Sequence, residues 1–306
     1  MRFAIIAPEV PTQRWKKELE VLAPEIPLVI GSETAYADEV VCAMVWKQAR
    51  GALLPFKNLK LIFSMGAGVD HVLADDTIPE HLPICRVIDP QMAFSMSNYL
   101  LMAVMNHHRS FYDYQNAQQK KRWAQFEFPE KQLKIGVLGT GFLGMDIALK
   151  LHHLGFAVSG YSTRPKETPF PSYAGKALPD FLATLNVLIC LVPFTPQTEG
   201  LLNYALFKKF KEPTYLINVS RGAVHVEKDL IRGLDEGLLN GVFLDVFEKE
   251  PLPKTSPLWS HPQVQLTPHI ASLTYARESV LQMLDCFRRV EKGLPLPQQV
   301  DRERRY

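Results

Sequence analysis

Short apolar runs alternate with amphipathic segments along the 306 residues of the chain. In the first third, residues 12–22 carry the spacing of a helix, and partly β-branched apolar runs predict strands at residues 2–7, 40–46 and 59–65. Strands that alternate with helices are joined by crossovers and run parallel. This part of the sequence therefore predicts a small α/β unit with a largely parallel sheet.

A second α/β series follows a long helical pattern over residues 97–121. Further helices are expected at residues 144–155 and 227–239, and the last one at 273–292. The expected strands lie at residues 133–139, 156–162, 187–193, 214–220, 241–247 and 264–269. The pattern as a whole predicts an α/β fold made of two units with parallel sheets.

Charge and cysteine usage exclude several classes of protein. The 34 Lys and Arg nearly balance the 32 Asp and Glu, so we expect no nucleic-acid partner. No apolar run reaches the roughly 18 residues of a membrane span, so we expect no membrane partner. The 4 cysteines are far apart, which favours reduced thiols in a cytoplasmic protein over disulfides or a zinc site. No HxxxH pair with a supporting carboxylate indicates a metal.

A glycine-rich turn is the first sign of specific chemistry. Gly139, Gly141 and Gly144 have G-x-G-x-x-G spacing, after an apolar strand and at the start of a helix. The first glycine permits the tight turn, the second lets the backbone approach a pyrophosphate, and the third allows close helix packing. With Phe142 and Leu143 between them, these residues form a candidate cofactor-binding turn. The alternative is a glycine turn with a structural role alone.

The end of the next expected strand predicts which dinucleotide binds. NAD-binding turns of this kind place Asp or Glu there, to hold the ribose hydroxyls. This chain has Ser162, Thr163 and Arg164, followed by Lys166. Hydroxyls and a guanidinium bind a 2′-phosphate by charge-assisted hydrogen bonds, whereas a carboxylate repels it. We therefore expect NADP(H), with NAD(H) as the weaker alternative; a solvated basic loop is the other interpretation.

Longer motifs follow one another along the chain, at residues 64–73, 136–144, 191–203, 217–230, 243–253 and 266–274. In this order they resemble the D-isomer-specific 2-hydroxyacid dehydrogenase family over essentially the whole sequence, and within it the bacterial enzymes that reduce glyoxylate and hydroxypyruvate. The resemblance implies two Rossmann/flavodoxin-like domains with an active-site cleft between them. It implies a discontinuous, flavodoxin-like substrate domain (residues 1–98 plus 273–306) and an NADP-binding Rossmann domain (residues 99–272).

The resemblance also implies roles for individual residues. Arg221 would clamp the carboxylate and carbonyl oxygen of the substrate, because a guanidinium fork suits planar, bidentate binding. His269 would donate a proton to the carbonyl oxygen, and Glu250 would pair with His269 to favour its protonated form. Asp245 would hold the nicotinamide carboxamide. The remaining residues of the implied cofactor cleft are Val192, Pro193, Thr198 and Val219.

The expected substrate residues lie in the first third of the chain and on the last helix. Gly68 lets the backbone approach closely, so amides near Ala67 and Gly68 are expected to face the substrate carboxylate. Trp46 resembles an aromatic residue that narrows the pocket, or is an ordinary core tryptophan. Arg277 adds a second positive group or lies at the surface. A narrow cationic pocket suits small 2-oxo acids.

The expected function is therefore NADPH-dependent reduction of glyoxylate to glycolate and of hydroxypyruvate to D-glycerate. Two alternatives remain open: a D-2-hydroxyacid dehydrogenase for a larger 2-oxo acid, and a non-catalytic dinucleotide-sensing protein. The joint presence of Arg221, Glu250 and His269 favours an enzyme. The long helix that begins near Ser97 resembles the dimerisation element of the family and predicts a homodimer.

Overall fold

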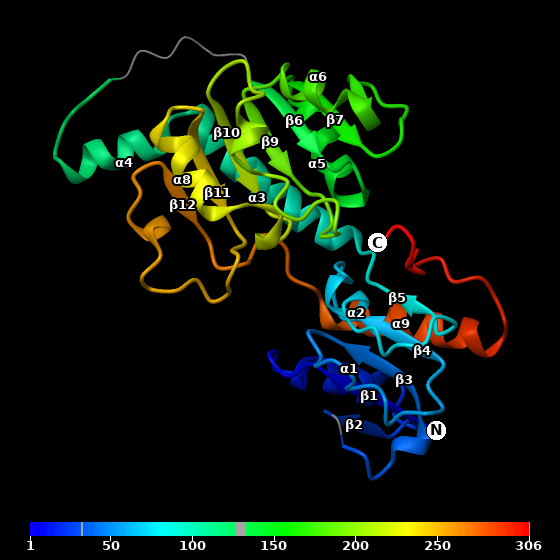
Figure 1. Cartoon of the computed structure of the whole chain (residues 1–306). Helices are drawn as coiled ribbons and strands as arrows, with labels where there is room; N and C mark the ends of the chain where they lie inside the picture. The colour runs from blue at the N-terminus through cyan, green and yellow to red at the C-terminus, as the bar shows by residue number, and fades with distance from the viewer. Residues whose placement is uncertain (32, 126–132, 306) are drawn as a thin grey trace. The chain divides into compact units, whose positions relative to one another are not determined.

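The computed structural model describes residues 1–31, 33–125 and 133–305, which fold into two compact units. The first unit contains residues 1–90 and 274–306, and the second contains residues 91–273 (Figure 1). The boundary expected at residue 98 falls inside helix α3 (Pro90–His108). The helix packs into the core of the second unit, and the chain therefore divides near its first residue.

The first unit has a five-stranded parallel sheet in the order β2-β1-β3-β4-β5. The strands are β1 (Arg2–Ile6), β2 (Leu28–Ile30), β3 (Val40–Val45), β4 (Leu61–Ser64) and β5 (Ile84–Cys85). Helices α1 (Gln13–Leu22) and α9 (Ala276–Glu291) contact each other, and α2 (Asp70–Leu73) follows β4. The Phe3 ring packs on the Phe287 ring with centroids 4.8 Å apart, which joins the terminal helix to the sheet.

The second unit has a seven-stranded parallel sheet in the order β12-β11-β10-β9-β6-β7-β8. The strands are β6 (Lys134–Leu138), β7 (Ala157–Ser162), β8 (Ser172–Ala174), β9 (Val187–Cys190), β10 (Thr214–Asn218), β11 (Leu239–Leu244) and β12 (Val264–Leu266). The strand order reverses between β6 and β9. In open α/β sheets, ligands bind outside the carboxyl ends of the strands at such a reversal.

Helices cover both faces of the second sheet, which explains the continuous apolar runs of its strands. Val187 and Ile189 of β9 pack with α3 and with α5 (Phe142–His153). Leu188 and Cys190 face the opposite side. That side is covered by α6 (Leu178–Leu182), α7 (Tyr204–Phe207) and α8 (Glu227–Asp235).

The helix expected over residues 97–121 is wrong in its extent. Helix α3 ends at His108, and a separate helix α4 (Phe111–Gln119) follows. Ser110 between them is left-handed, with a φ of 49°, and this turns the chain. Figure 1 shows α4 extending beyond α3 and away from the sheet of the second unit. Helix α3 also starts earlier than expected, at Pro90, a residue suited to a first helical turn.

The structure also bears on the cysteines and on membrane spans. All 4 cysteines are free and buried. Among the described residues, no helix is both long and apolar enough to cross a membrane.

Candidate active site

Three adjacent strands carry the expected catalytic residues of the second unit. Arg221 follows β10, Glu250 lies in the loop after β11, and His269 follows β12. Strands β10, β11 and β12 are neighbours in the parallel sheet, so their carboxyl ends lie at one edge. The expected position of all three residues beyond strand ends is confirmed.

Glu250 and His269 form a direct pair. Nδ1 of His269 lies 2.8 Å from Oε2 of Glu250, and the backbone N–H of Phe247 donates to the other carboxylate oxygen at 3.2 Å. The two side chains are 24% and 37% exposed, so the pair is reachable from solvent while its carboxylate is partly shielded. A carboxylate bound to one ring nitrogen fixes the orientation of an imidazole and leaves the other nitrogen for a ligand.

The turn that carries His269 is held by the buried carboxylate of Asp245. One carboxylate oxygen accepts hydrogen bonds from the Thr267 hydroxyl at 2.6 Å and the Ile270 N–H at 2.8 Å, and the other accepts from the Ala271 N–H at 2.8 Å. His269 has a φ of 55°, a left-handed conformation that costs about 1–3 kcal/mol for a residue with a side chain. The three bonds to Asp245 stabilise this strained turn.

Asp245 was expected to hold the nicotinamide carboxamide. In the structure its carboxylate accepts these three hydrogen bonds from the protein itself. The hydroxyl of Tyr99 on α3 makes a short hydrogen bond with the Thr267 hydroxyl. Burial is the main cause that raises the pKa of Tyr99, so the phenol stays protonated. No pattern in the sequence pointed to Tyr99 or Thr267 as supports of the site.

A side-chain network closes the Arg221 loop. The side-chain oxygen of Asn218 accepts from the N–H of Ser220 at 3.0 Å and from its hydroxyl at 2.7 Å. The Asn218 amide nitrogen donates to the carbonyl of Arg221 at 3.2 Å. The guanidinium of Arg221 donates to the Ser220 carbonyl at 2.8 Å. Asn218, the last residue of β10, therefore fixes the backbone from which Arg221 projects.

The loops after β10 and β11 are packed against each other, backbone to backbone. A Cβ atom on Gly222 would lie 1.7 Å from the carbonyl oxygen of Phe247, so only glycine fits there. The N–H of Glu227 donates to the Glu248 carboxylate at 2.8 Å, and the N–H of Glu248 donates to the Glu227 carboxylate at 3.1 Å. The Arg221 loop and the Glu250 loop therefore hold each other in place.

The glycine-rich turn has the shape that a dinucleotide requires. A Cβ on Gly144 would lie 2.0 Å from the carbonyl oxygen of Gly139, and Gly139 itself has a φ of +102°, so both must be glycine. A Cβ on Gly141 would meet nothing within 4 Å, which leaves open space at the start of α5. The Thr140 hydroxyl beside it is buried and has no hydrogen-bond partner among the described residues. This turn fits a bound pyrophosphate.

The basic segment after β7 lies against the same turn. The ammonium of Lys166 donates to the carbonyl of Thr140, and the Ser162 hydroxyl donates to the carbonyl of Arg164 at 2.6 Å. Thr163, Arg164 and Lys166 are exposed. In the described parts of the chain, Arg164 forms no ion pair. Hydroxyl, guanidinium and ammonium groups beside a glycine turn are the types of donor that bind a 2′-phosphate.

The other expected cofactor residues lie around the strand reversal. Val192 and Pro193 follow β9, and the Thr198 hydroxyl donates to the Pro193 carbonyl at 2.7 Å. Val219 is buried directly after β10. Phe142, the first residue of α5, is 46% exposed, and Leu143 beside it packs partly into the core. These positions agree with a binding edge at the carboxyl ends of β6, β9 and β10.

In the first unit, the structure brings Trp46 and the loop after β4 together. A Cβ on Gly66 would lie 2.5 Å from the Trp46 ring, and the ring packs on His71 with centroids 4.7 Å apart. The Ser64 hydroxyl donates to the Gly68 carbonyl at 2.8 Å, which fixes the loop that includes Ala67. The indole therefore forms a wall beside residues 66–68.

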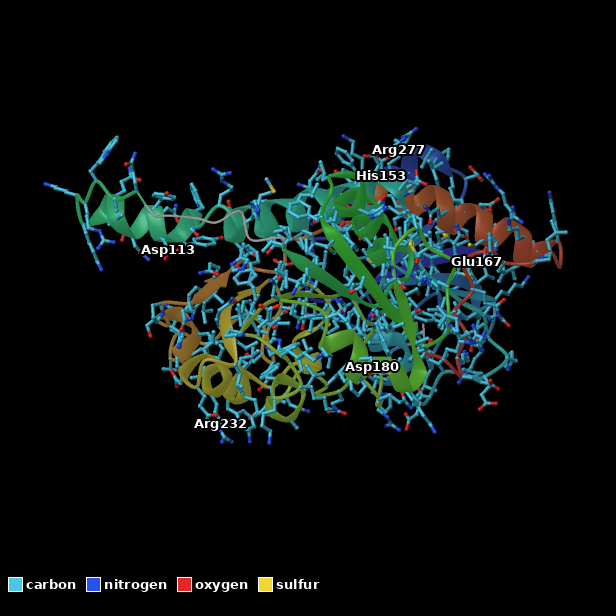
Figure 2. All side chains as sticks on the ribbon, turned by 90° about the horizontal axis from the view of Figure 1, so that it is seen from above. Asp113, His153, Glu167, Asp180, Arg232 and Arg277 are labelled. Carbon is cyan, nitrogen blue, oxygen red and sulfur yellow. The ribbon has the colours of Figure 1, made fainter. Side chains whose placement is uncertain are left out.

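Arg277 is engaged elsewhere in the first unit. Its guanidinium pairs with the carboxylate of Glu18 on α1 at 3.0 Å, and its side chain is 61% exposed (Figure 2). The pair lies between helices α9 and α1. Arg277 therefore has a carboxylate partner within its own unit.

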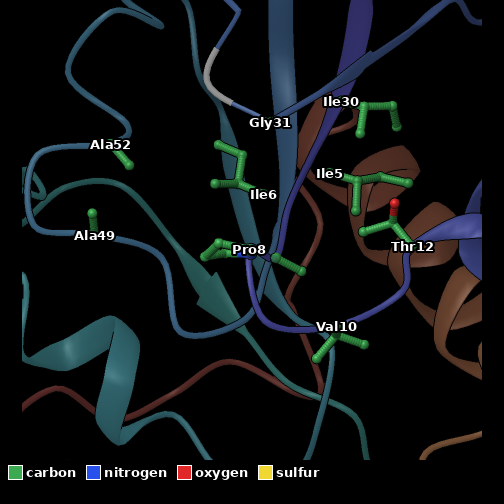
Figure 3. A pocket seen from close by; sticks show the side chains of 10 residues that line it. Ile5, Ile6, Pro8, Val10, Thr12, Ile30, Gly31, Ala49 and Ala52 are labelled. Atoms are coloured by element: carbon green, nitrogen blue, oxygen red, sulfur yellow. The ribbon is translucent and has the colours of Figure 1, made fainter.

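The first unit also contains an apolar pocket of about 330 Å³ at the carboxyl ends of β1 and β2 (Figure 3). Its walls include Ile5, Ile6, Val10, Ile30 and Ala52. Among the described residues no charged side chain lines it, so they offer an anion no compensation for lost water. A polar acid substrate has no reason to bind in this pocket.

The fold and the site together define a doubly wound α/β protein of the dinucleotide-binding class. Among the described residues, no group of three or more His, Cys, Asp or Glu side chains is arranged to hold a metal. The family model described as the NAD binding domain of the D-isomer specific 2-hydroxyacid dehydrogenases matches residues 101–271. The chain belongs to this family, which confirms the resemblance expected from its motifs.

Similarity to known proteins extends over the whole chain. The chain is 35% identical to a glyoxylate/hydroxypyruvate reductase A from Klebsiella pneumoniae, and the alignment covers 100% of both sequences. A D-isomer specific 2-hydroxyacid dehydrogenase from Xanthobacter autotrophicus Py2, in complex with NADPH and MES, is 36% identical with a TM-score of 0.93. An NADPH-dependent glyoxylate/hydroxypyruvate reductase from Sinorhizobium meliloti, in complex with NADP and sulfate, is 32% identical with a TM-score of 0.93. Each structural match covers 100% of this chain and 99% of the other.

His225 is a support of the site that sequence patterns did not mark. The residue is 1% exposed, and its Nδ1 lies 2.8 Å from the amide nitrogen of Asn218. An amide nitrogen can only donate, so Nδ1 must accept and the imidazole is neutral. Burial lowers the pKa of His225 to about 4 from its ordinary 6.5.

His225 should make folding sensitive to acid. Below pH 6.5 His225 takes up a proton in the unfolded chain, whereas in the native protein it stays neutral down to about pH 4. The free energy of unfolding therefore decreases as the pH falls from 6.5 to about 4. His225→Asn keeps an acceptor for Asn218 and removes the titration. From urea unfolding at pH 7 and pH 4.5, we expect the free energy of unfolding of wild type to fall by about 2 kcal/mol more than that of the variant. Parallel pH dependences would contradict this account.

Proposed function

We propose that this protein reduces small 2-oxo acids with NADPH, converting glyoxylate to glycolate and hydroxypyruvate to D-glycerate. The observation that carries the proposal is the 2.8 Å pair between Glu250 and His269, at the sheet edge that also presents Arg221. The full-length relatives that are named as reductases of these two acids support the same reaction. The D configuration follows from the family.

Arg221, His269 and Glu250 each have a distinct task. NADPH supplies a hydride to C2 of the substrate when it is bound. Arg221 binds the carboxylate and the carbonyl oxygen of the substrate, and its positive charge stabilises the oxygen as negative charge develops there. His269 donates a proton from Nε2 to this oxygen. Glu250 orients the ring through Nδ1 and stabilises the imidazolium that the donation requires.

The cofactor site is proposed around the glycine-rich turn. The space at Gly141 and the N-terminus of α5 receive the pyrophosphate. Ser162, Thr163 and Arg164 bind the 2′-phosphate, and Lys166 adds positive charge beside Thr140. Relatives in complex with NADPH and with NADP support this choice of dinucleotide. Asp245 acts mainly through the His269 turn, because its oxygens already accept three hydrogen bonds.

The substrate side of the proposal rests on the first unit. The backbone of Ala67 and Gly68 meets the substrate carboxylate, and the Trp46 ring beside this loop limits the size of the group on C2. Arg277 is committed to Glu18, so its contribution to substrate binding is proposed to be smaller than that of Arg221. A pocket bounded by an indole favours the two small acids over larger ones.

We also infer a cytoplasmic homodimer. Free, buried cysteines suit a reducing compartment. Large apolar side chains are exposed along α3 and α4: Met102, Met105, Phe111 and Tyr114. Several large apolar side chains exposed on two successive helices are typical of a protein interface. Figure 2 shows Asp113 of α4 far out from the sheet of its unit, where a second copy can cover the helix.

Activity and its dependence on the pair test the proposed reaction. Initial rates should show turnover of glyoxylate and hydroxypyruvate with NADPH, with lower rates for pyruvate and phosphohydroxypyruvate. His269→Ala should lower kcat about 100-fold or more, and Glu250→Gln about tenfold or more, because general acid catalysis contributes factors of this size. His261→Ala, which removes an imidazole paired with Asp235, is the matched control and should keep wild-type rates. Full activity of His269→Ala would refute the mechanism, and NADPH binding without turnover would favour a sensing protein.

Removal of one guanidinium tests the choice of cofactor. Arg164→Met should raise KM for NADPH about tenfold, the value of one charge-assisted hydrogen bond, and leave KM for NADH nearly unchanged. The matched control is Arg232→Met, because Arg232 is an exposed arginine of the same unit that pairs with Glu236. Steady-state kinetics with both cofactors measures the effect. Equal losses for NADPH and NADH would show that Arg164 does not bind the 2′-phosphate.

The dimer is tested by mass. Sedimentation of the 34.7 kDa chain should give twice this mass, and Phe111→Asp on α4 should shift the protein toward the monomer, because a carboxylate cannot be buried unpaired. Asp113→Ser on the same helix is the control and should remain dimeric. A monomeric wild type at micromolar concentration would rule out the proposed interface.

A further inference from the structure

Arg86 is an unusual cation of the first unit. It follows β5 directly and is partly buried. Within the described residues its guanidinium donates one hydrogen bond, from Nη1 to the Ala67 carbonyl at 3.5 Å, the upper limit for such a bond. Over the parts of the chain that the structure describes, Arg86 forms no ion pair. Burial lowers its pKa, with no carboxylate acting in the opposite direction.

Arg302 shows what a partly buried structural arginine in the same unit looks like. Its Nη2 donates to the carbonyls of Pro79 at 2.9 Å and Leu82 at 2.7 Å. Glu80 nearby raises the pKa of Arg302 and so offsets part of the effect of burial. Arg302 is therefore satisfied by the protein itself. Arg86, by contrast, has one long bond for five N–H donors.

The backbone of Arg86 is fixed by hydrogen bonds, although its guanidinium donates only the one long bond to Ala67. Its backbone N–H donates to the Gln298 carbonyl at 3.2 Å, and the N–H of Val87 donates to the Gly66 carbonyl at 3.3 Å. The segment of Arg86 is thus attached to the loop of residues 66–68, which also contacts the Trp46 ring. A guanidinium, a glycine-containing loop and an indole wall meet at one place in this unit.

A partly buried guanidinium without a carboxylate partner destabilises the protein unless it binds an anion. Partial burial removes water from the guanidinium, and no side chain of the described chain replaces that water with negative charge. An arginine fork offers parallel N–H donors that match a carboxylate. The loop carbonyl of Ala67 holds one edge of the fork, and the remaining donors are available to a ligand.

We propose that Arg86 is a substrate-binding residue that receives the carboxylate of the 2-oxo acid at the loop of residues 66–68. This inference rests on the proposed function and adds a side chain to a site otherwise assigned to backbone amides. Arg86 selects for a carboxylate whose neighbouring group is small enough for the space left by Trp46. A neutral carbonyl compound gains nothing from it and is discriminated against.

A binding role and a merely structural role predict opposite effects of Arg86→Met. If Arg86 mainly held the loop through the Ala67 carbonyl, its removal would lower the melting temperature. If Arg86 binds substrate, an unpaired cation is replaced by an apolar chain of similar length, and the melting temperature stays the same or rises. Stability and affinity therefore separate the two roles.

The experiment compares wild type with Arg86→Met, Arg86→Lys and the matched control Arg302→Met. It measures kcat, KM for glyoxylate, KM for NADPH and melting temperature. It also measures the Kd of oxamate, a non-reducible amide analogue of glyoxylate, by calorimetry on the enzyme saturated with NADPH. For Arg86→Met we expect KM for glyoxylate and Kd for oxamate to rise about tenfold or more, with KM for NADPH and the melting temperature unchanged. Arg86→Lys should lie between, because it keeps the charge without the fork.

The result for the control variant and the two possible contradictions can be told apart. Arg302→Met should melt at a lower temperature and keep its affinity for glyoxylate and oxamate. Unchanged oxamate affinity in Arg86→Met, or a loss of folding in this variant, would overturn the role of Arg86. Absence of turnover in wild type would instead refute the proposed function, and the oxamate titrations would still decide whether Arg86 binds a carboxylate.

Discussion

The carboxylate of Asp245 is the constraint on which the site depends. It accepts three hydrogen bonds from the turn that follows β12, and this turn places His269 in a left-handed conformation beside Glu250. Without this anchor the turn would relax, because the conformation costs about 1–3 kcal/mol. Asp245 is itself fixed at the end of β11, where its N–H donates to the Asn218 carbonyl at 3.1 Å. The sheet therefore sets the position of the His269 imidazole through the hydrogen bonds of one buried carboxylate.

Much of the fold was predictable because both faces of the larger sheet are buried. Its strands other than β8 contain apolar runs, and these runs were visible in the sequence. The short strands β2, β5 and β8 were missed, since two or three residues give no pattern that periodicity can detect. The division of the long helix at Ser110 was also missed, because a single left-handed residue leaves no gap in the helical spacing.

The candidate site divides in the same way. Glycine spacing located the expected cofactor turn, and the family resemblance of the motifs implied the pair of Glu250 with His269, since both depend on order along the chain. The three-bond anchor of Asp245, the buried neutral His225 and the unpaired Arg86 depend on contacts between segments far apart in sequence. Whether a polar side chain has a hydrogen-bond or ion-pair partner depends on the folded structure and cannot be seen in the sequence pattern. The structure shows the contacts that hold the His269 turn and the Arg221 loop.

Transfer of isotope from cofactor to product tests the central claim most directly. Hydroxypyruvate would be incubated with the enzyme and NADPH carrying deuterium at both C4 positions, and the glycerate formed would be examined by NMR and chiral chromatography. The account predicts D-glycerate with one deuterium at C2, because hydride reaches the carbonyl carbon and the proton from His269 reaches the oxygen. Glycerate without deuterium at C2, or of the L configuration, would contradict the assignment of the site.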